Sequence, residues 1–398
     1  MKKIFVFSHA LEIGGAERAL LGLLESFDVS GYEVDLFLMR HEGELMGRIP
    51  DKVHLLPPIE EYSCLAVPIA DVLKKKQFGI AMGRLTAKKK ARDFLKKYAV
   101  TGDNGVELEY SHKYTLKYMP EISGTEYDLA ISFLTPHYFV SEKVKAKKKI
   151  AWIHTDYSHL EVDTESEEKM WGKYDYIASI SDKCTEGFLK RFPSLESKIK
   201  RIDNIILPSF IISQANSENI ETQMPKNNGM TLLSVGRFSN AKNFDNVPEI
   251  CKMIRETGLD IRWYLIGYGG DEELIRRKIA EAGMEDYVII LGKKENPYPY
   301  IKACDLYVQP SRYEGKAVTV REAQILHKPV VITTFETSES QLTDGFDGVI
   351  VPMDNEGCAA GIAAVLRDEN LRQRLIDNTK KTDYTNSDET QKIYRLVE

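Results

Sequence analysis

The sequence predicts an α/β fold with two doubly wound domains, and three observations support this expectation. The chain has 398 residues, which is too many for one ordinary hydrophobic core. Its first half alternates apolar, strand-like runs with helical stretches. A strand, loop, helix and strand then follow one another between residues 306 and 333. We therefore expect a first domain over 1–205, a linker over 206–230, a second domain over 231–380 and a terminal helix within 381–398.

The expected strands are short apolar runs that end at polar or glycine-containing segments. The linker is expected because residues 206–230 are polar and include Pro225 and Gly229. In the first domain the strands are Ile4 to Phe7, Val34 to Leu38, Leu129 to Phe133, Ile150 to Ile153 and Tyr176 to Ile180. In the second they include Leu232 to Val235, Leu306 to Val308 and Val330 to Thr333.

The composition is typical of a globular protein, and the formal net charge of -6 gives no reason to expect a nucleic-acid partner. The five cysteines are scattered, odd in number and form no C-x-x-C pair. This pattern indicates reduced thiols in a cytoplasmic protein, not a disulfide framework or a zinc site. The cysteines are Cys64, Cys184, Cys251, Cys304 and Cys358.

The amino terminus, MKKIFVFSHALEIGG, has lysines before an apolar run, as a secretory signal does. Ser8, His9 and Glu12 interrupt that run too early for a signal peptide, so we interpret it as the first strand. No stretch of the chain is apolar over the length that would span a bilayer. We therefore expect a cytoplasmic protein.

The segment SRYEGKAVTVREAQ contains Glu314 and Glu322, separated by seven residues in a loop that leads into a helix. Because the segment follows a predicted strand, both carboxylates should lie at the carboxyl edge of a parallel sheet, where ligands bind in such folds. Taken alone, the spacing also fits two solvated glutamates on an ordinary helix. The flanking strands favour a site.

A second motif, LLSVGRFSNAKNFDNV, has a strand that ends at Gly236, followed by Arg237 and Lys242. Glycine permits a sharp turn, and a guanidinium with an ammonium suits a diphosphate beside a helix amino terminus. Taken singly, each cation fits a solvated surface residue equally well.

Two motifs of the first domain also place polar or small residues after a strand. Gly15 lies in the GGAE turn after the first strand, where the lack of a Cβ would let the backbone approach a ligand. His154 ends the apolar run of KIAWIHTDY. The alternatives are a plain strand-to-helix turn for Gly15 and a core or surface imidazole for His154.

Together these motifs resemble the family 4 glycosyltransferases. SVGR followed by Lys242, LIGYG, the LG at 291 and 292, and EGKAVTVREA occur in that family's order and roughly its spacing. The resemblance implies a GT-B fold, in which two Rossmann-like doubly wound domains face a central cleft. It also implies that the first domain binds the acceptor, that the second binds the donor, and that the last helix crosses back to the first domain.

The resemblance implies transfer of a sugar from a nucleotide diphosphate sugar with retention of the anomeric configuration. Glu314 would hold the transferred sugar, Glu322 the ribose, Arg237 and Lys242 the diphosphate, and His154 would face the sugar. Amides of residues 315–320 would contact sugar and phosphate. The expected catalytic residues are Glu314, Arg237, Lys242 and His154, and the expected donor-binding residues are Gly15, Gly236, Gly267, Lys293, Gly315, Lys316, Ala317, Val318, Thr319 and Glu322.

We expect no metal or other cofactor, because no two aspartates form the Asp-x-Asp motif with which other sugar transferases hold a divalent ion. Arg237 and Lys242 would neutralise the leaving group instead. Uridine is the expected base, from what bacterial-looking members of the family use. The Lys316 that follows EG, where many relatives carry an apolar residue, leaves the sugar undefined.

The expected acceptor is a glycan or a lipid-linked oligosaccharide of bacterial polysaccharide synthesis, such as capsule or exopolysaccharide. Residues 73–97 are strongly basic with apolar residues interleaved, and a second lysine cluster lies at 143–149. A basic amphipathic surface can hold a protein on the anionic inner face of the plasma membrane. The alternative is a solvated basic helix.

Other classes of protein share parts of this pattern. A nonhydrolysing nucleotide-sugar epimerase shares the fold, and a catalytically silent partner subunit would bind nucleotide without turnover. A dehydrogenase is disfavoured because neither GYGG at 267–270 nor GG at 14–15 completes G-x-G-x-x-G with a downstream acid. A glycosidase would need two opposed carboxylates around one bond.

Overall fold

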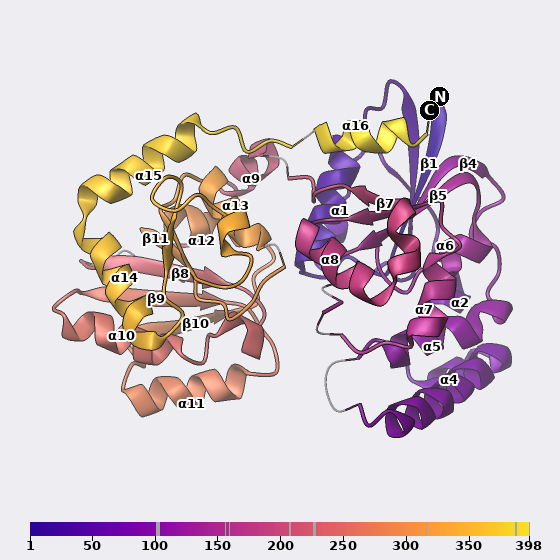
Figure 1. The fold of residues 1–398 in the computed structure, drawn as a ribbon, viewed down its shortest axis with the longest axis horizontal. Coiled ribbons are helices and arrows are strands. Elements are labelled where there is room, and N and C mark those ends of the chain that lie inside the picture. The colour runs from indigo at the N-terminus through magenta and orange to yellow at the C-terminus, as the bar shows by residue number, and fades with distance from the viewer. Residues whose placement is uncertain are drawn as a thin grey trace. The chain divides into compact units, whose positions relative to one another are not determined.

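The computed structural model describes residues 1–100, 104–155, 157–158, 160–206, 208–225, 228–315, 317–386 and 388–397. The chain forms two compact units (Figure 1). The first comprises Met1–Ile206 together with Asn386–Glu398, and the second comprises Leu207–Thr385.

The first unit is built on a seven-stranded sheet of order β3-β2-β1-β4-β5-β6-β7. Every neighbouring pair of strands is parallel, so all carboxyl ends lie at one edge. The strands are β1 Lys2–Ser8, β2 Tyr32–Leu38, β3 His54–Leu55, β4 Glu126–Ser132, β5 Lys145–Ile153, β6 Tyr176–Ser179 and β7 Ile199–Arg201. The helices are α1 Gly15–Ser26, α2 Glu60–Ser63, α3 Ile69–Lys74, α4 Phe78–Lys97, α5 Val106–Thr115, α6 Tyr138–Lys143, α7 Thr164–Trp171, α8 Asp182–Arg191 and α16 Asp388–Arg395.

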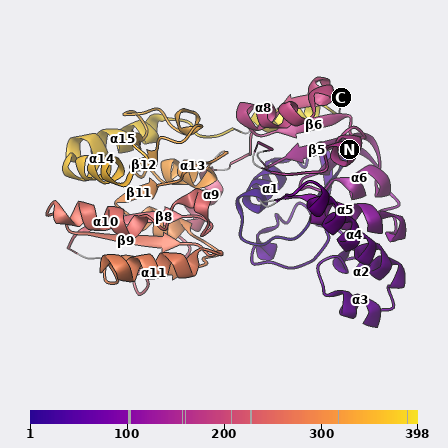
Figure 2. The same cartoon turned by 60° about the horizontal axis from the view of Figure 1, so that its bottom comes forward.

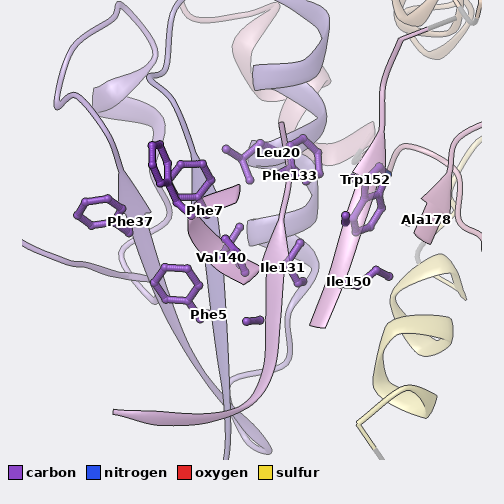
Figure 3. Packing of buried hydrophobic residues seen from close by; sticks show 14 of the residues in the cluster. Phe5, Phe7, Leu20, Phe37, Ile131, Phe133, Val140, Ile150, Trp152 and Ala178 are labelled. Carbon is purple, nitrogen blue, oxygen red and sulfur yellow. The ribbon is translucent and has the colours of Figure 1, made fainter. Parts of the chain in front are cut away.

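The five strands expected in this unit are confirmed, and the structure adds β3 and β7. The central strands are nearly continuous apolar runs because both faces of a parallel sheet are covered. Figure 3 shows the resulting core, in which aromatic and branched side chains of β1, β4 and β5 pack with Leu20 of α1 and Val140 of α6.

The second unit has a six-stranded parallel sheet of order β10-β9-β8-β11-β12-β13. Helices cover both faces (Figures 1 and 2): α10 contacts α11 and α14, whereas α9, α12 and α13 contact one another. The strands are β8 Met230–Val235, β9 Ile261–Ile266, β10 Val288–Gly292, β11 Leu306–Gln309, β12 Val330–Thr333 and β13 Val349–Val351. The helices are α9 Pro208–Gln214, α10 Val247–Glu256, α11 Glu272–Ala282, α12 Tyr298–Ala303, α13 Val318–Ile325, α14 Asn355–Arg367 and α15 Glu369–Lys381.

The segment 206–230, expected to be a linker, differs from that expectation. It contains α9, and it is fastened to the second unit by side-chain hydrogen bonds. Asn296 Nδ2 donates to the carbonyl of Gln214 at 2.9 Å, and the Tyr300 hydroxyl donates to Gln223 Oε1 at 2.7 Å. The polar composition therefore reflects a hydrogen-bonded surface layer, which a sequence pattern does not distinguish from a hinge.

The terminal helix α16 belongs to the first unit. Its Tyr394 stacks on Tyr32 with ring centroids 4.1 Å apart, and the Tyr394 hydroxyl accepts a hydrogen bond from the Asp28 amide at 2.7 Å. Asn386, just before the helix, bridges the Ile206 amide and the Asn204 carbonyl. In Figure 1 the yellow α16 accordingly lies beside β1, with both chain ends close together.

Candidate active site

The predicted site residues of the second unit follow four neighbouring strands of its sheet, β10, β9, β8 and β11, at their carboxyl ends. Gly236 follows β8, Gly267 follows β9 and Lys293 follows β10, while the loop after β11 carries Glu314. Backbone hydrogen bonds join the first three turns: the Gly236 amide donates to Ile266, and the Gly267 amide donates to Gly292, both at 3.0 Å. The carboxyl edge of the sheet is therefore one connected surface.

The turns at Gly236 and Gly267 approach each other too closely for a side chain at Gly267. A Cβ at Gly267 would lie 1.9 Å from the carbonyl oxygen of Gly236. A Cβ at Gly236 would lie 3.2 Å from the Cδ and Cε atoms of Lys242. The absence of a side chain at Gly236 thus leaves space for the aliphatic part of the Lys242 side chain beside the turn after β8. This packing fixes the direction from which the ammonium group of Lys242 reaches the site.

Lys242 and Glu314 form an ion pair at the centre of this edge. The Lys242 Nζ to Glu314 Oε1 distance is 2.5 Å, and the side chains are only 20% and 9% exposed. The same Oε1 accepts a hydrogen bond from Ser311 Oγ at 2.6 Å. Two residues that the sequence predicted from separate motifs, 72 positions apart, are thus direct partners.

The loop after Glu314 is braced by two side chains from the segment that follows β12. Thr337 Oγ1 donates to the Glu314 carbonyl at 2.8 Å, and Gln341 Oε1 accepts from the Ala317 amide at 2.8 Å. The Val320 amide donates to the Ala317 carbonyl. The amides of Ala317 and Val320 thus have hydrogen-bond partners within the domain, and contact of the amides of residues 315–320 with the donor stays a prediction.

Glu322 lies on α13 with its side chain buried, and Tyr298 from α12 donates to its Oε1 at 2.9 Å. Tyr307 of β11 is buried as well, and its hydroxyl donates to Gln309 Oε1 at 2.8 Å. Burial raises the pKa of Tyr307, so its hydroxyl keeps the proton that it donates. Thr319 Oγ1 also donates to Gln309 Oε1, at 3.3 Å, which ties the first turn of α13 to β11.

Arg237 and Lys293, the other two cations of the predicted site, are exposed to solvent. Arg237 is exposed and forms no ion pair with another described residue. Lys293 Nζ lies 4.8 Å from the centroid of the Tyr268 ring, a cation–π contact that holds its ammonium beside the turn after β9. Gly315 and Val318 lie on the same edge at the start of α13. Lys316 lies outside the described residues.

Gly15 and His154 lie in the first unit. Gly15 begins α1, and a Cβ added there would meet nothing within 4 Å, so no contact inside the structure requires glycine. His154 follows β5, and the centroids of the His154 and Phe133 rings lie 4.3 Å apart. Burial lowers the pKa of His154 to about 3, so this imidazole is neutral at physiological pH. Its Nε2 is buried without a hydrogen-bond partner among the described residues.

The part of the chain that the structure describes has no group of three His, Cys, Asp or Glu residues arranged to hold a metal ion. In the same residues, no helix combines the length and the apolar character needed to cross a bilayer.

Sequence reasoning missed the residues that support the site. Most of them carry no motif of their own, because their partners are distant in the chain and only the fold brings them together. The sole local signal is the SR pair before Glu314, where Ser311 contacts the glutamate directly. The supporting residues are Asp245, Tyr298, Gln309, Ser311, Arg312, Thr337 and Gln341.

Comparison with protein families matches residues 216–382 to the model described as glycosyl transferases group 1. This range lies inside the second unit and contains the site of Lys242, Glu314 and Glu322. Residues 216–382 belong to the group 1 glycosyltransferases. The chain is a glycosyltransferase, and the family match does not favour the epimerase alternative.

A relative that spans most of this glycosyltransferase is the N-acetylgalactosamine-N,N'-diacetylbacillosaminyl-diphospho-undecaprenol 4-alpha-N-acetylgalactosaminyltransferase of Campylobacter jejuni. It is 24% identical over 392 residues, covering 96% of this chain and 94% of the relative. The amylovoran biosynthesis glycosyltransferase AmsK of Erwinia amylovora is 28% identical over 145 residues, which cover 34% of this chain and 35% of AmsK.

Among solved structures, Anabaena HepE in complex with UDP and glucose superposes with a TM-score of 0.68 at 16% sequence identity. The match covers 100% of this glycosyltransferase and 99% of HepE. At this identity the likeness shows the fold alone. The two parallel α/β units are the GT-B fold that the sequence predicted.

Proposed function

We propose that this glycosyltransferase moves a sugar from a uridine diphosphate sugar to a glycan or lipid-linked acceptor during bacterial polysaccharide assembly. The observation that carries the proposal is the Lys242–Glu314 ion pair at the carboxyl edge of a group 1 glycosyltransferase domain. The HepE complex with UDP and the Campylobacter and Erwinia relatives support the donor and the pathway class.

The proposed chemistry assigns the two cations to the leaving group. As the bond between the sugar and the diphosphate breaks, negative charge grows on the diphosphate, and Lys242 and Arg237 stabilise it more in the transition state than in the bound donor. The short first turn of α13, with the amides of Val318 and Thr319, adds a partial positive charge. Glu314 holds hydroxyls of the transferred sugar, and Glu322 holds the ribose.

Retention of the anomeric configuration is part of the proposal. The departing phosphate would assist the incoming acceptor hydroxyl on the same face of the sugar, so no protein nucleophile is needed. Arg237 and Lys242 supply the positive charge that a divalent ion would otherwise supply, and we therefore propose catalysis without a metal. His154 remains proposed as a neutral contact to the donor sugar.

Calorimetric titration with UDP, GDP and ADP, each with and without EDTA, tests the donor site. We expect UDP to bind selectively, with a Kd that EDTA leaves unchanged. Arg237→Ala should weaken binding at least about tenfold, since a charged hydrogen bond contributes about 1.5–3 kcal/mol. Arg277→Ala, an exposed arginine of α11, is the matched control and should bind as the wild type does. Absence of binding to all three nucleotides would overturn the proposal, and a requirement for metal would overturn its metal-free form.

We also propose that the protein works in the cytoplasm, at the membrane surface, where a lipid-linked acceptor such as the diphospho-undecaprenol compound in the name of the Campylobacter relative would lie. The two basic clusters of the sequence, at 73–97 and 143–149, differ in their ion pairs. Lysines of β5 already have acidic partners: Lys145 pairs with Glu121 at 3.0 Å, and Lys147 pairs with Asp128 at 2.8 Å. These charges are therefore neutralised within the unit.

Helix α4 presents a different surface, which we call the α4 stripe. Its members alternate at spacings of four and three residues, so they share one face of the helix. All are exposed, and the cations form no hydrogen bond or ion pair with other described residues. The opposite face holds small residues such as Gly83 that let α4 approach α5 closely. The stripe comprises Phe78, Met82, Leu85, Lys89, Arg92 and Lys96.

The α4 stripe suits an anionic lipid surface. Phe78, Met82 and Leu85 are 64%, 56% and 56% exposed, and such apolar side chains can enter the boundary between headgroups and acyl chains. The three cations lie on the same face of α4, and each adds about 1 kcal/mol to the free energy of binding to an anionic leaflet.

Vesicle flotation tests this surface. Replacing Lys89, Arg92 and Lys96 together by glutamine should lower partitioning onto vesicles containing phosphatidylglycerol by about 100-fold, since three cations at about 1 kcal/mol each are lost. The matched control replaces Lys145, Lys147 and Lys148 by glutamine, which changes the net charge equally and should leave partitioning nearly unchanged. Equal binding of the wild type to neutral and anionic vesicles, or equal losses in both variants, would contradict the proposal.

A further inference from the structure

The loop that carries Glu314 is fastened to the segment that carries Lys242 through Arg312. The Arg312 guanidinium makes a two-point contact with Asp245: Nη1 donates to Oδ1 at 2.9 Å and Nη2 donates to Oδ2 at 2.8 Å. Nη1 also donates to the Asn240 carbonyl at 2.7 Å, and the Arg312 amide donates to the Ala241 carbonyl at 2.8 Å. Four hydrogen bonds therefore join the two segments.

These hydrogen bonds lie on both sides of Lys242, which precedes Asn243, a residue whose backbone is in the left-handed region. Lys242 ends a short 3₁₀ turn, Asn240–Lys242, and Asn243 has φ 60° with its side chain buried. Arg312 contacts this turn on both sides of Lys242, at Asn240 and Ala241 before it and at Asp245 after it. The backbone from which Lys242 projects is thus held at both ends by one arginine.

The same two segments meet a second time through the Lys242–Glu314 ion pair. A two-point guanidinium–carboxylate contact fixes both distance and orientation, which a single ammonium contact does not. The side chains of Arg312 and Asp245 are 26% and 18% exposed, so the pair is partly shielded from solvent. The Lys242 ammonium, which has a single ion-pair contact among the described residues, is therefore the member that can exchange partners while the arginine contact persists.

We propose that Arg312 and Asp245 are positioning residues of the donor site, which hold Lys242 where its ammonium passes from Glu314 to the diphosphate of the donor. The inference rests on the proposed function and extends it. Before donor binding, Glu314 neutralises Lys242; when the diphosphate takes the ammonium, the Glu314 carboxylate is released toward the sugar hydroxyls. Arg312 and Asp245 keep both exchange partners within reach and do not touch the donor themselves.

Calorimetric binding of UDP to Asp245→Asn tests the inference. The substitution keeps the shape of the side chain and removes one of the two charge-assisted hydrogen bonds, so we expect UDP affinity to fall about tenfold through misplacement of Lys242. Asp260→Asn is the matched control, because Asp260 pairs with Arg255 at 2.8 Å in the same unit and contacts no site residue. Its UDP affinity should stay within about twofold of the wild type.

The decisive readout repeats both substitutions in Lys242→Ala. If Asp245 acts through Lys242, Asp245→Asn should cause no further loss of UDP affinity in that background. An equal loss in both backgrounds, or a loss no larger than that of Asp260→Asn, would overturn the inference. Arg312→Lys, which retains the charge but not the two-point contact, gives a second test if Asp245→Asn fails to fold. Absence of UDP binding to the wild type would instead count against the proposed function.

Discussion

Lys242→Ala is expected to lower kcat/KM by about 100-fold to 1,000-fold, the typical loss when one group that stabilises developing charge is removed. Lys242 is the shielded cation of the site, 20% exposed and in contact with Glu314, so water replaces it poorly. The loss should appear mainly in kcat, because the charge on the diphosphate grows as the sugar bond breaks. Steady-state kinetics with UDP-sugar donors measures it.

Lys302→Ala is the matched control for that variant. Lys302 is an exposed lysine of α12, and its ammonium donates a hydrogen bond to Asn216 in the same unit. We expect its kcat/KM to stay within about twofold of the wild type, in line with the small effects of surface substitutions. If Lys242→Ala and Lys302→Ala had equal activity, Lys242 would have no role in the chemistry.

Glu314→Gln should lower kcat about 100-fold while UDP binds more tightly. The amide cannot hold the sugar hydroxyls as the carboxylate does, so transition-state contacts are lost. The same change frees the Lys242 ammonium for the diphosphate, and losing a competing ion pair that contributes about 1 kcal/mol corresponds to about fivefold tighter binding. Steady-state kinetics measures the expected fall in kcat, and calorimetry measures the expected gain in UDP affinity.

A matched control for this variant is Glu272→Gln, at an exposed ion pair with Arg276 on α11. Neither kcat nor the Kd for UDP should change there. Weaker UDP binding in Glu314→Gln would show that the carboxylate supports the nucleotide site as a whole. The exchange of Lys242 between Glu314 and phosphate would then be wrong.

Most strands could be predicted because parallel strands buried on both faces are continuous apolar runs, as in β1 and β8. The sequence did not indicate β3 and β7. His54–Leu55 has only two residues, and Ile199–Arg201 carries two cations, so neither has a pattern of its own. Pairing with β2 and β6 makes them strands.

The residues of the candidate site also fall into those that the sequence predicted and those that it did not. Residues of motifs could be predicted one by one, since Gly236, Lys242, Glu314 and Glu322 each follow a recognisable strand end or helix start. Gln341 and Tyr298 could not, because a lone glutamine or tyrosine gains meaning only from the partner it reaches. Their partners, Ala317 and Glu322, lie 24 residues away in the chain in both cases.

The sequence by itself determined the α/β class, the second-unit motifs and the polarity of the carboxyl edge, because these depend on local apolar runs, glycine turns and the spacing of charged residues. Only the tertiary structure decided which charges are partners. It paired Lys242 with Glu314 and Arg312 with Asp245, paired Lys145 and Lys147 of β5 with carboxylates, and left the side chains of the α4 stripe exposed. Ion pairing depends on distances of a few ångströms between residues far apart in the chain, and those distances exist only once the sheets have formed.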